Sequence, residues 1–206
     1  MEDILETYAL PYDPEQPMIC MDEQPLQLLG EKHPPIAMQP GQVYKEDYEY
    51  VRKGTCSIFV FTEPLGGWRH VVARERRTKT DWALLIQELL DVHYPSAKRI
   101  RLVMDNLNTH TVSSLYETFP PDIALALARR LEIHYTPKHG SWLNIAEIEL
   151  NVMTKQCLSR RFDHIAQLQY HLSAWEHERN TKHCLVKWQF TTHTARDRLC
   201  WLYPKF

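Results

Sequence analysis

Two aspartates each follow a short apolar stretch that is typical of a buried strand. Met18–Met21 precedes Asp22, and Ile100–Met104 precedes Asp105. A charged residue that directly follows a buried strand lies at the carboxyl edge of the sheet. Open α/β sheets place their ligand-binding and active sites at this edge. If the strands are neighbours, the two carboxylates repel each other unless protons or hard divalent cations intervene. The pair therefore indicates a metal site, although either aspartate alone is more typical of a turn or cap.

The elements that must position these aspartates begin with a hairpin and a helix. A loop containing Pro34, Pro35, Pro40 and Gly41 leads to the β-rich run Thr55–Thr62, which the turn PLGG joins to Trp68–Ala73. This pattern predicts an antiparallel hairpin. A helix is predicted next, with Thr80 as its N-cap. Its buried face has the spacing i, i+3, i+4, i+7, i+8, in Trp82, Leu85, Ile86, Leu89 and Leu90.

The second half of the chain is predicted to contain three helices and one further strand. We expect the helices at 121–131, 142–158 and 164–179, and the strand at 132–135. The order β, ββ, α, β, α, β, α, α is typical of a mixed sheet with helices packed on it. A nucleotide cofactor is not expected, because the sequence contains neither common type of glycine-rich phosphate loop.

Longer motifs surround the two aspartates. VMDNLNTH (103–110) is followed by HYTPKHGSWLNIAEIEL (134–150), with a strand-like MICMDEQ at 18–24. These segments resemble the mariner-like DDE transposases, in particular their bacterial insertion-sequence branch (the insertion sequence 630 family). In that family an Asp-Asn pair ends a strand, and a Tyr-Thr/Ser-Pro segment leads to Leu-Asn-x-x-Glu at a helix start. AWEHERN (174–180) and WQFTTHTARDRL (188–199) resemble the family's C-terminal helices.

The resemblance implies an α/β, RNase H-like mixed sheet flanked by helices, and a metal-dependent DNA endonuclease that also performs strand transfer. Asp22, Asp105 and Glu147 would hold two Mg²⁺ or Mn²⁺ ions. The implied partner is DNA, as transposon ends and as a target at TA dinucleotides, bound by a homodimer and without a membrane. Two alternatives are an RNase H-like nuclease without strand transfer and an inactive descendant that only binds DNA or a partner.

The side chains around the carboxylates have more than one interpretation. His110 could contact phosphate, orient Asp105 or pack on the strand. Asn106 could contact the metal or cap the following turn, and the cap is favoured. Asn144 and Glu147 belong to the helix-start motif. Glu149 stands two residues further on, on the apolar face of the predicted helix, so it is a second candidate for the third ligand. If Glu147 is the ligand, we expect a buried arginine to neutralise Glu149.

Basic and aromatic residues provide candidate DNA contacts. The connecting loop after the hairpin could contact the phosphate backbone, or could simply be solvated; it contains Arg74, Arg76, Arg77 and Lys79. Lys138 and Trp142 are further candidates, because a tryptophan could stack on a base near the cleavage site. The interpretation favoured for Trp142 is packing in the core. Arg160 and Arg161 are expected to close the helix that contains Glu147.

Bulk properties agree with a reducing cytoplasm, and the family resemblance implies the bacterial cytoplasm or nucleoid. The net charge is −2 and is unevenly distributed along the chain. Residues 1–50 contain eleven acidic and two basic residues, whereas residues 150–206 contain four acidic and nine basic residues. The five cysteines are odd in number and show no paired spacing, so neither a disulfide framework nor a zinc ribbon is expected. A zinc enzyme is disfavoured, since the eleven histidines form no HExxH motif. The longest apolar runs are too short to span a membrane.

Domain organisation is expected to be a single catalytic domain at about 15–180 with a C-terminal helical tail. Only some twenty residues precede Asp22, so the family's N-terminal helix-turn-helix DNA-binding segments are expected to be absent. The 41 residues between Asp105 and Glu147 exceed the spacing of compact relatives. We expect the extra length in a helical insert near 117–130.

Overall fold

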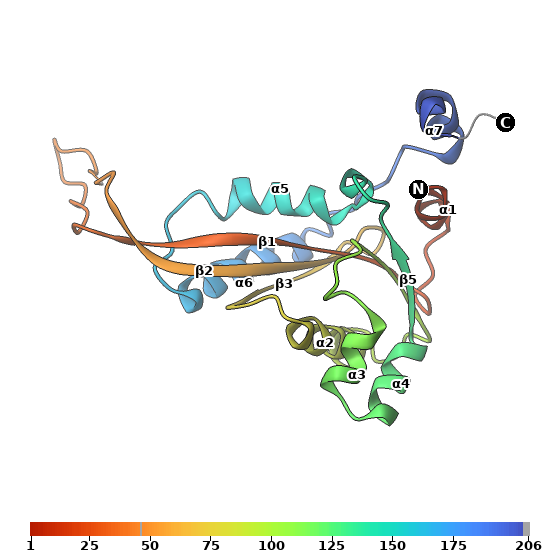
Figure 1. The fold of residues 1–206 in the computed structure, drawn as a ribbon. Helices are drawn as coiled ribbons and strands as arrows, with labels where there is room; N and C mark the ends of the chain where they lie inside the picture. Colours follow the sequence, from red (N-terminus) through yellow and green to blue (C-terminus); the bar gives the residue numbers. More distant parts are fainter. Residues whose placement is uncertain (46, 204–206) are drawn as a thin grey trace.

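A five-stranded mixed sheet forms the centre of the computed structural model, which describes residues 1–45 and 47–203. The strand order is β3-β2-β1-β4-β5, with β1, β2 and β3 antiparallel and with β1, β4 and β5 parallel (Figure 1). The strands are β1 (Met18–Glu31), β2 (Tyr50–Glu63), β3 (Trp68–Arg74), β4 (Ile100–Met104) and β5 (Leu131–Tyr135). This arrangement confirms the predicted mixed sheet.

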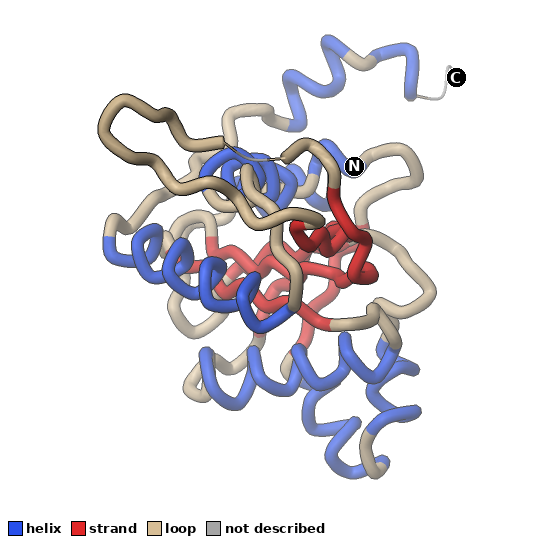
Figure 2. The backbone as a smooth tube through the Cα atoms, turned by 90° about the vertical axis from the view of Figure 1, so that its left-hand side faces the viewer, coloured by secondary structure: helices blue, strands red, loops and turns tan. Residues whose placement is uncertain are grey.

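Helices cover both faces of the sheet: α2, α3 and α4 lie on one side, and α5 and α6 on the other (Figures 1 and 2). None of the helices among the described residues is both long and apolar enough to cross a membrane. The helices are α1 (Glu2–Ala9), α2 (Lys79–Glu88), α3 (Val112–Thr118), α4 (Pro121–Arg129), α5 (Ala146–Gln156), α6 (Ile165–Thr181) and α7 (Thr192–Arg198), with a π-helical turn (Leu89–His93) and 3₁₀ turns (Ser141–Leu143, Cys200–Leu202).

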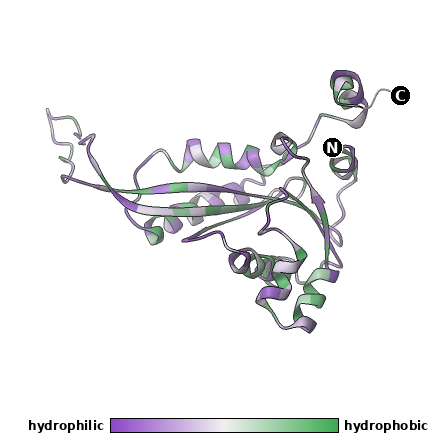
Figure 3. Cartoon of the chain, viewed as in Figure 1, coloured by the Kyte–Doolittle hydropathy of each residue, from purple (hydrophilic) through white to green (hydrophobic). Residues whose placement is uncertain are grey.

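The two faces of the sheet have separate apolar cores, because side chains alternate along each strand. On β2, Phe59 and Phe61 pack toward α2 and α4, whereas Ile58 and Val60 pack toward α5 and α6. Figure 3 shows the apolar colour on the middle of β2 and on α4. The buried face predicted for α2 is confirmed, since Trp82 and the four aliphatic residues predicted with it are at most 1% exposed.

A third apolar cluster joins the two ends of the chain to the sheet. It includes Ile4 and Leu5 of α1, Ala195 of α7, Cys20 of β1 and Val103 of β4. The hydroxyl of Tyr8 also donates to the carbonyl of Leu143 at 2.7 Å. The α1 helix therefore supports the segment that leads into α5.

Several predicted boundaries need correction, and β2 begins at Tyr50 instead of the predicted Thr55. β1 does not end before Asp22, because its pairing with β2 continues to Glu31 and Tyr50. The N-cap of α2 is Thr78 and not Thr80, because Thr78 and Asp81 form a reciprocal capping box. The predicted helix 142–158 is divided into a 3₁₀ turn and α5.

Candidate active site

Asp22 and Asp105 lie side by side where β1 and β4 diverge. The parallel register pairs Cys20 with Val103, so two residues further on Asp22 stands opposite Asp105. Asp22 shares the face of Cys20 on β1, whereas Asp105 lies one residue beyond the end of β4. Neighbouring strands are about 4.8 Å apart. The register therefore places the two residues beside each other, with Asp105 directly after β4 and Asp22 inside the longer β1.

Asn144 connects the start of α5 to β1. Its buried side-chain amide donates to the carbonyl of Met21 at 2.8 Å and to Oδ2 of Asp22 at 3.3 Å. Its Oδ1 accepts from the backbone N–H of Ala146 at 3.1 Å, which satisfies one of the free donors at the helix start. Asn144 thus holds the first turn of α5, which contains Glu147, against the strand that contains Asp22.

The electrostatics of Asp22 show that the carboxylates form one group. Burial, together with the charges of Glu147, Asp105 and Glu23, raises the pKa of Asp22 from its usual value near 4 to about 7, against the hydrogen bond that Asp22 accepts from the Glu23 N–H. The free energy needed to ionise Asp22 is thus increased by its surroundings. A cation among these carboxylates would remove that cost.

His110 joins Asp105 to a second acidic residue, Glu23, which the motif analysis missed. Nδ1 of His110 donates to Asp105 at 2.6 Å and Nε2 donates to Glu23 at 3.0 Å. Burial alone lowers the pKa of His110, but these hydrogen bonds and charges outweigh it and raise the pKa to about 9. The imidazole is therefore cationic at neutral pH. Of the predicted roles of His110, the structure shows both a hydrogen bond to Asp105 and packing, because the ring is 1% exposed and lies beside Trp82.

Glu23 could have been found from strand periodicity. It lies on the same face of β1 as Ile19 and Met21, and only 3% of its side chain is exposed. A buried carboxylate on an apolar face requires a partner. Besides His110, that partner is Arg77, whose guanidinium lies 3.3 Å from Glu23.

The donor set of this site fits divalent cations with oxygen ligands. Among the described residues, the only groups whose ligand atoms all lie within 4.8 Å of one another are two other clusters. The carboxylates of Asp22, Asp105 and Glu147 do not form such a three-ligand cluster. Their oxygen atoms are nevertheless of the type that hard divalent cations such as Mg²⁺ prefer.

Comparison with known families decides the family of the chain. The sequence profile of the DDE superfamily endonucleases matches residues 17–169, which include all three carboxylates. The chain belongs to this family. A search of curated protein sequences found no match.

Solved structures similar to this DDE endonuclease domain are complexes of the Mos1 mariner transposase. The paired end complex with Mn has a TM-score of 0.56 and 16% identity, covering 89% of this chain and 55% of that one. The strand transfer complex has a TM-score of 0.57 and 16% identity, covering 89% and 54%. This likeness shows the RNase H-like fold. The DDE domain spans about 55% of the length of the transposase chain that it matches.

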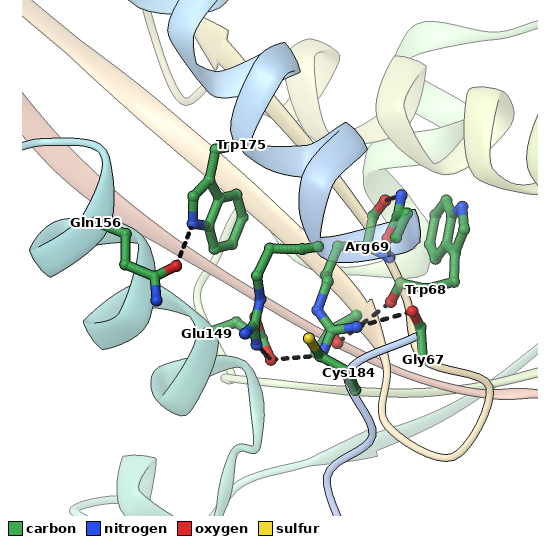
Figure 4. A network of polar contacts seen from close by, with 10 residues as sticks. Gly67, Trp68, Arg69, Glu149, Gln156, Trp175 and Cys184 are labelled. Atoms are coloured by element: carbon green, nitrogen blue, oxygen red, sulfur yellow. Dashed lines mark hydrogen bonds and ion pairs between the residues drawn. The ribbon is translucent and has the colours of Figure 1, made fainter. Parts of the chain in front are cut away.

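Glu149 lies in a buried ionic cluster on the opposite side of α5 from the site. Its carboxylate accepts from Arg69 at 2.7 Å and from Arg179 at 3.0 and 3.1 Å. Arg69 also donates to the carbonyls of Gly67 and Cys184 (Figure 4). The expected neutralisation of Glu149 by a buried arginine is confirmed.

The predicted basic cluster of the DDE domain is largely paired with acidic side chains. Arg77 contacts Glu23 at 3.3 Å, Lys79 contacts Glu117 at 2.6 Å, and Arg74 contacts Glu88 at 3.8 Å. Arg76 is exposed. The Lys79 and Arg74 pairs are partly exposed on both sides, so each contributes little to stability, whereas Glu23 of the Arg77 pair is only 3% exposed.

Trp142 is not a core residue. It is 47% exposed, contacts Phe190 edge to face, and lines an open groove together with Glu147. The core prediction was wrong because it treated 142–158 as one continuous helix, whereas Asn144 is extended and interrupts it. Lys138 is exposed in the loop just before Trp142.

Two further predictions concern Asn106 and the arginine pair Arg160 and Arg161. Asn106 is exposed and lines a shallow surface pocket with Arg77, and the turn after it is closed by a backbone hydrogen bond from His110 to Leu107. Arg160 and Arg161 do not close α5, which ends at Gln156. Arg161 instead binds Glu31 at 2.8 Å and backbone carbonyls of the loop that follows β1.

Proposed function

We propose that this chain is the catalytic domain of a DNA transposase of the mariner-like superfamily, from its bacterial insertion-sequence branch. The observation that supports this most is the match of the DDE superfamily endonuclease profile to residues 17–169, which contain Asp22, Asp105 and Glu147. Asp22 and Asp105 are in register, and Asn144 holds the helix turn of Glu147 beside them. The proposed reaction is cleavage of a DNA strand followed by transfer of its 3′-hydroxyl to a target.

The proposed cofactors are two Mg²⁺ or Mn²⁺ ions, held by Asp22, Asp105 and Glu147. Bound ions would supply activation of the attacking oxygen and stabilisation of the leaving oxygen in an in-line displacement. The chain's own residues position the ligands. Asn144 orients Asp22, and cationic His110 binds one oxygen of Asp105, so the other oxygen of Asp105 can face the site.

The proposed partner is DNA, as transposon ends and as a target that the family resemblance places at TA dinucleotides. Exposed Trp142 beside Glu147 can stack on a base next to the scissile phosphate. Exposed Arg76 and Lys138 are the proposed contacts to the DNA backbone. We propose that two copies act together on DNA in the bacterial cytoplasm or nucleoid.

An oligonucleotide assay with Mg²⁺ or Mn²⁺ tests this function. Duplexes that carry transposon ends or a pre-formed 3′-hydroxyl end are mixed with the domain and a supercoiled target. We expect both nicked strands and joined products, and both should require metal. Hydrolysis without joining would indicate a nuclease that lacks strand transfer. Binding without any product would indicate an inactive descendant.

Replacing Asp22 by asparagine is expected to stabilise the metal-free domain at pH 8 by about 2 kcal/mol. The folded state raises the pKa of Asp22, so this carboxyl favours folding below pH 4, and that contribution is lost as the pH rises through about 7. Asparagine never ionises and escapes the loss. Urea denaturation at pH 4 and pH 8 measures the difference.

Divalent metal should make the unmodified domain more stable than the Asp22→Asn variant at pH 8. Mg²⁺ or Mn²⁺ is expected to raise the melting temperature of the unmodified domain at pH 8 and to have little effect on Asp22→Asn. Equal stabilities at pH 8 without metal would contradict the role of burial and charge at Asp22. An equal metal response in both proteins would contradict its role as a ligand.

DNA binding by this domain is expected to be weak, to show little sequence preference and to depend strongly on salt. About four phosphate contacts predict a fall in affinity of roughly 100-fold between 50 and 200 mM salt. Arg76→Ala and Lys138→Ala should each reduce the salt slope by about one. Lys98→Ala is the matched control, because Lys98 is exposed and pairs with Glu15. Tight, salt-tolerant and sequence-selective binding would contradict the prediction.

A further inference from the structure

A second group of ligand-type side chains lies at the edge strand β3, two strands away from β1. His70, Glu88 and His93 each offer one ligand atom within 4.8 Å of the other two. Oε1 of Glu88 lies 3.5 Å from Nε2 of His70 and 3.9 Å from Nε2 of His93. Both imidazoles therefore direct the same type of nitrogen toward one carboxylate oxygen.

The π-helical turn brings Glu88 and His93 together. Residues five apart in an α-helix point about 140° away from each other, since each residue advances about 100°. The chain instead forms a π-turn over Leu89–His93 directly after Glu88, and its i→i+5 pattern places both side chains on the same side. Single π-turns inside helices occur frequently at functional sites.

The two histidine nitrogens lack hydrogen bonds. Nε2 of His70 and Nε2 of His93 are both buried and unpartnered among the described residues. Burial and the neighbouring His70 also lower the pKa of His93, which favours its neutral imidazole, the form that binds metal. A buried pair of ring nitrogens directed at a carboxylate needs an additional partner.

Glu176 of α6 orients His70. It lies 3.4 Å from Nδ1 of His70 and accepts from the backbone N–H of Val71 at 2.7 Å. When Nδ1–H of a histidine donates a hydrogen bond to a carboxylate, the lone pair remains on Nε2 and can bind a metal. This is the carboxylate–histidine–metal arrangement of known sites. Trp68 packs beside His93, with ring centroids 4.9 Å apart.

We propose that His70, Glu88 and His93 bind one late first-row divalent ion, with Zn²⁺ as the best fit, at a site separate from the DDE carboxylates. Zinc bonds to nitrogen and oxygen are about 2.0–2.2 Å long, so tetrahedral ligand atoms lie about 3.3–3.6 Å apart. The 3.5 and 3.9 Å separations are close to this value. Two nitrogen donors select zinc over magnesium, whereas the all-oxygen DDE site favours magnesium or manganese.

The site has consequences for the fold. It joins β3 to the end of α2, and through Glu176 it reaches α6, so a bound ion connects three elements around the sheet edge. Three protein ligands leave a fourth position open to solvent or to another donor. The only other such cluster among the described residues, His33, Asp47 and Glu49, is less suitable because Lys32 already binds Glu49 at 2.6 Å. In the proposed site Arg74 lies 3.8 Å from Oε2 of Glu88, so Oε1 remains directed at the two histidines.

Zinc titration of the metal-stripped protein tests the proposal, in excess Mg²⁺ so that the DDE site is occupied. We expect one equivalent of Zn²⁺ to bind, measured by competition with a chromogenic chelator. His93→Gln and His70→Gln should each weaken this binding at least 100-fold, and Glu176→Gln by about 10-fold. The matched control His177→Gln, an exposed histidine on α6, and the DDE variant Asp105→Asn should retain it.

Cobalt substitution gives a second measurement that does not depend on enzyme activity. Four-coordinate Co²⁺ with nitrogen ligands absorbs visible light strongly, whereas six-coordinate Co²⁺ with oxygen ligands absorbs weakly. We expect the strong spectrum in the unmodified protein and in Asp105→Asn, and its loss in His93→Gln. Unchanged Zn²⁺ binding in folded His70→Gln and His93→Gln proteins, or a weak spectrum in the unmodified protein, would overturn the proposal.

Discussion

Replacement of Asp105 by asparagine is expected to lower metal-dependent DNA cleavage by a factor of about 10³ or more, while the domain remains folded. Loss of a single electrostatic stabiliser costs roughly 3–4 kcal/mol of activation free energy, and a carboxylate that binds metal contributes at least as much. Asparagine keeps the oxygen that accepts the 2.6 Å hydrogen bond from His110. The variant therefore removes the charge with little change in shape.

Steady-state nicking of a supercoiled plasmid in Mg²⁺ and in Mn²⁺ measures this effect. Asp122→Asn is the matched control, because Asp122 is an exposed aspartate in the first turn of α4, away from the three carboxylates. We expect the control to cleave at the normal rate. Near-normal cleavage by Asp105→Asn, with a melting temperature equal to that of the unmodified domain, would remove Asp105 from the metal site.

The prediction of these aspartates from sequence depended on the apolar strands before them. Ile19 and Met21, like Leu102 and Met104, are fully buried, so the strands were recognisable from composition alone. The strand end was misjudged at Asp22 because the apolar run stops at Met21 while backbone pairing with β2 does not. Hydrogen bonding between strands is independent of side-chain polarity, so a polar residue does not mark the end of a strand.

The start of α5 shows a different limit of sequence patterns. A helical wheel that includes Trp142 assumes one continuous helix, but the chain is extended at Asn144, where the side chain binds Met21 and Asp22. These partners are more than 120 residues away in sequence. A local pattern contains no information about them, and so the exposure of Trp142 was not predictable from the wheel.

The bond from His110 to Glu23 was unpredictable for the same reason. His110 follows β4 and Glu23 lies on β1, 87 residues earlier in the sequence. The sequence indicated that His110 could orient Asp105, which is only five residues away. Contacts within a few residues could be anticipated, whereas contacts between elements required the register of the sheet.

The buried cluster around Glu149 makes Glu149→Gln the substitution with the largest expected effect on stability. Glu149 and Arg69 are both fully buried, and Arg179 is 17% exposed, so their charges are removed from water. Glutamine would leave two cationic groups without an anionic partner. Removal of one partner from a buried ion pair costs about 3–5 kcal/mol, and we expect about 3 kcal/mol because glutamine retains one acceptor oxygen.

Glu147→Gln should have the opposite profile, because Glu147 is exposed in the first turn of the same helix. Its free energy of unfolding should change by less than about 0.5 kcal/mol, whereas its metal-dependent cleavage should fall about 10³-fold. Urea denaturation and plasmid nicking, measured on both variants below the melting temperature of the weaker one, separate the two effects. Folded Glu149→Gln protein should keep its cleavage activity.

A compensating double substitution distinguishes a buried ionic cluster from a third metal ligand at Glu149. Glu149→Met combined with Arg69→Met replaces the fully buried pair by apolar side chains, which in other proteins is often neutral or stabilising. We expect it to recover part of the stability lost in Glu149→Gln, although Arg179 still lacks its partner, and to keep metal-dependent nicking. If the double variant is stable but inactive while Glu147→Gln remains active, the third ligand is Glu149. If Glu147→Gln alone is inactive and stable, the third carboxylate is Glu147, in the exposed first turn of α5. The position of this turn depends on the hydrogen bonds of Asn144 and not on the buried cluster around Glu149.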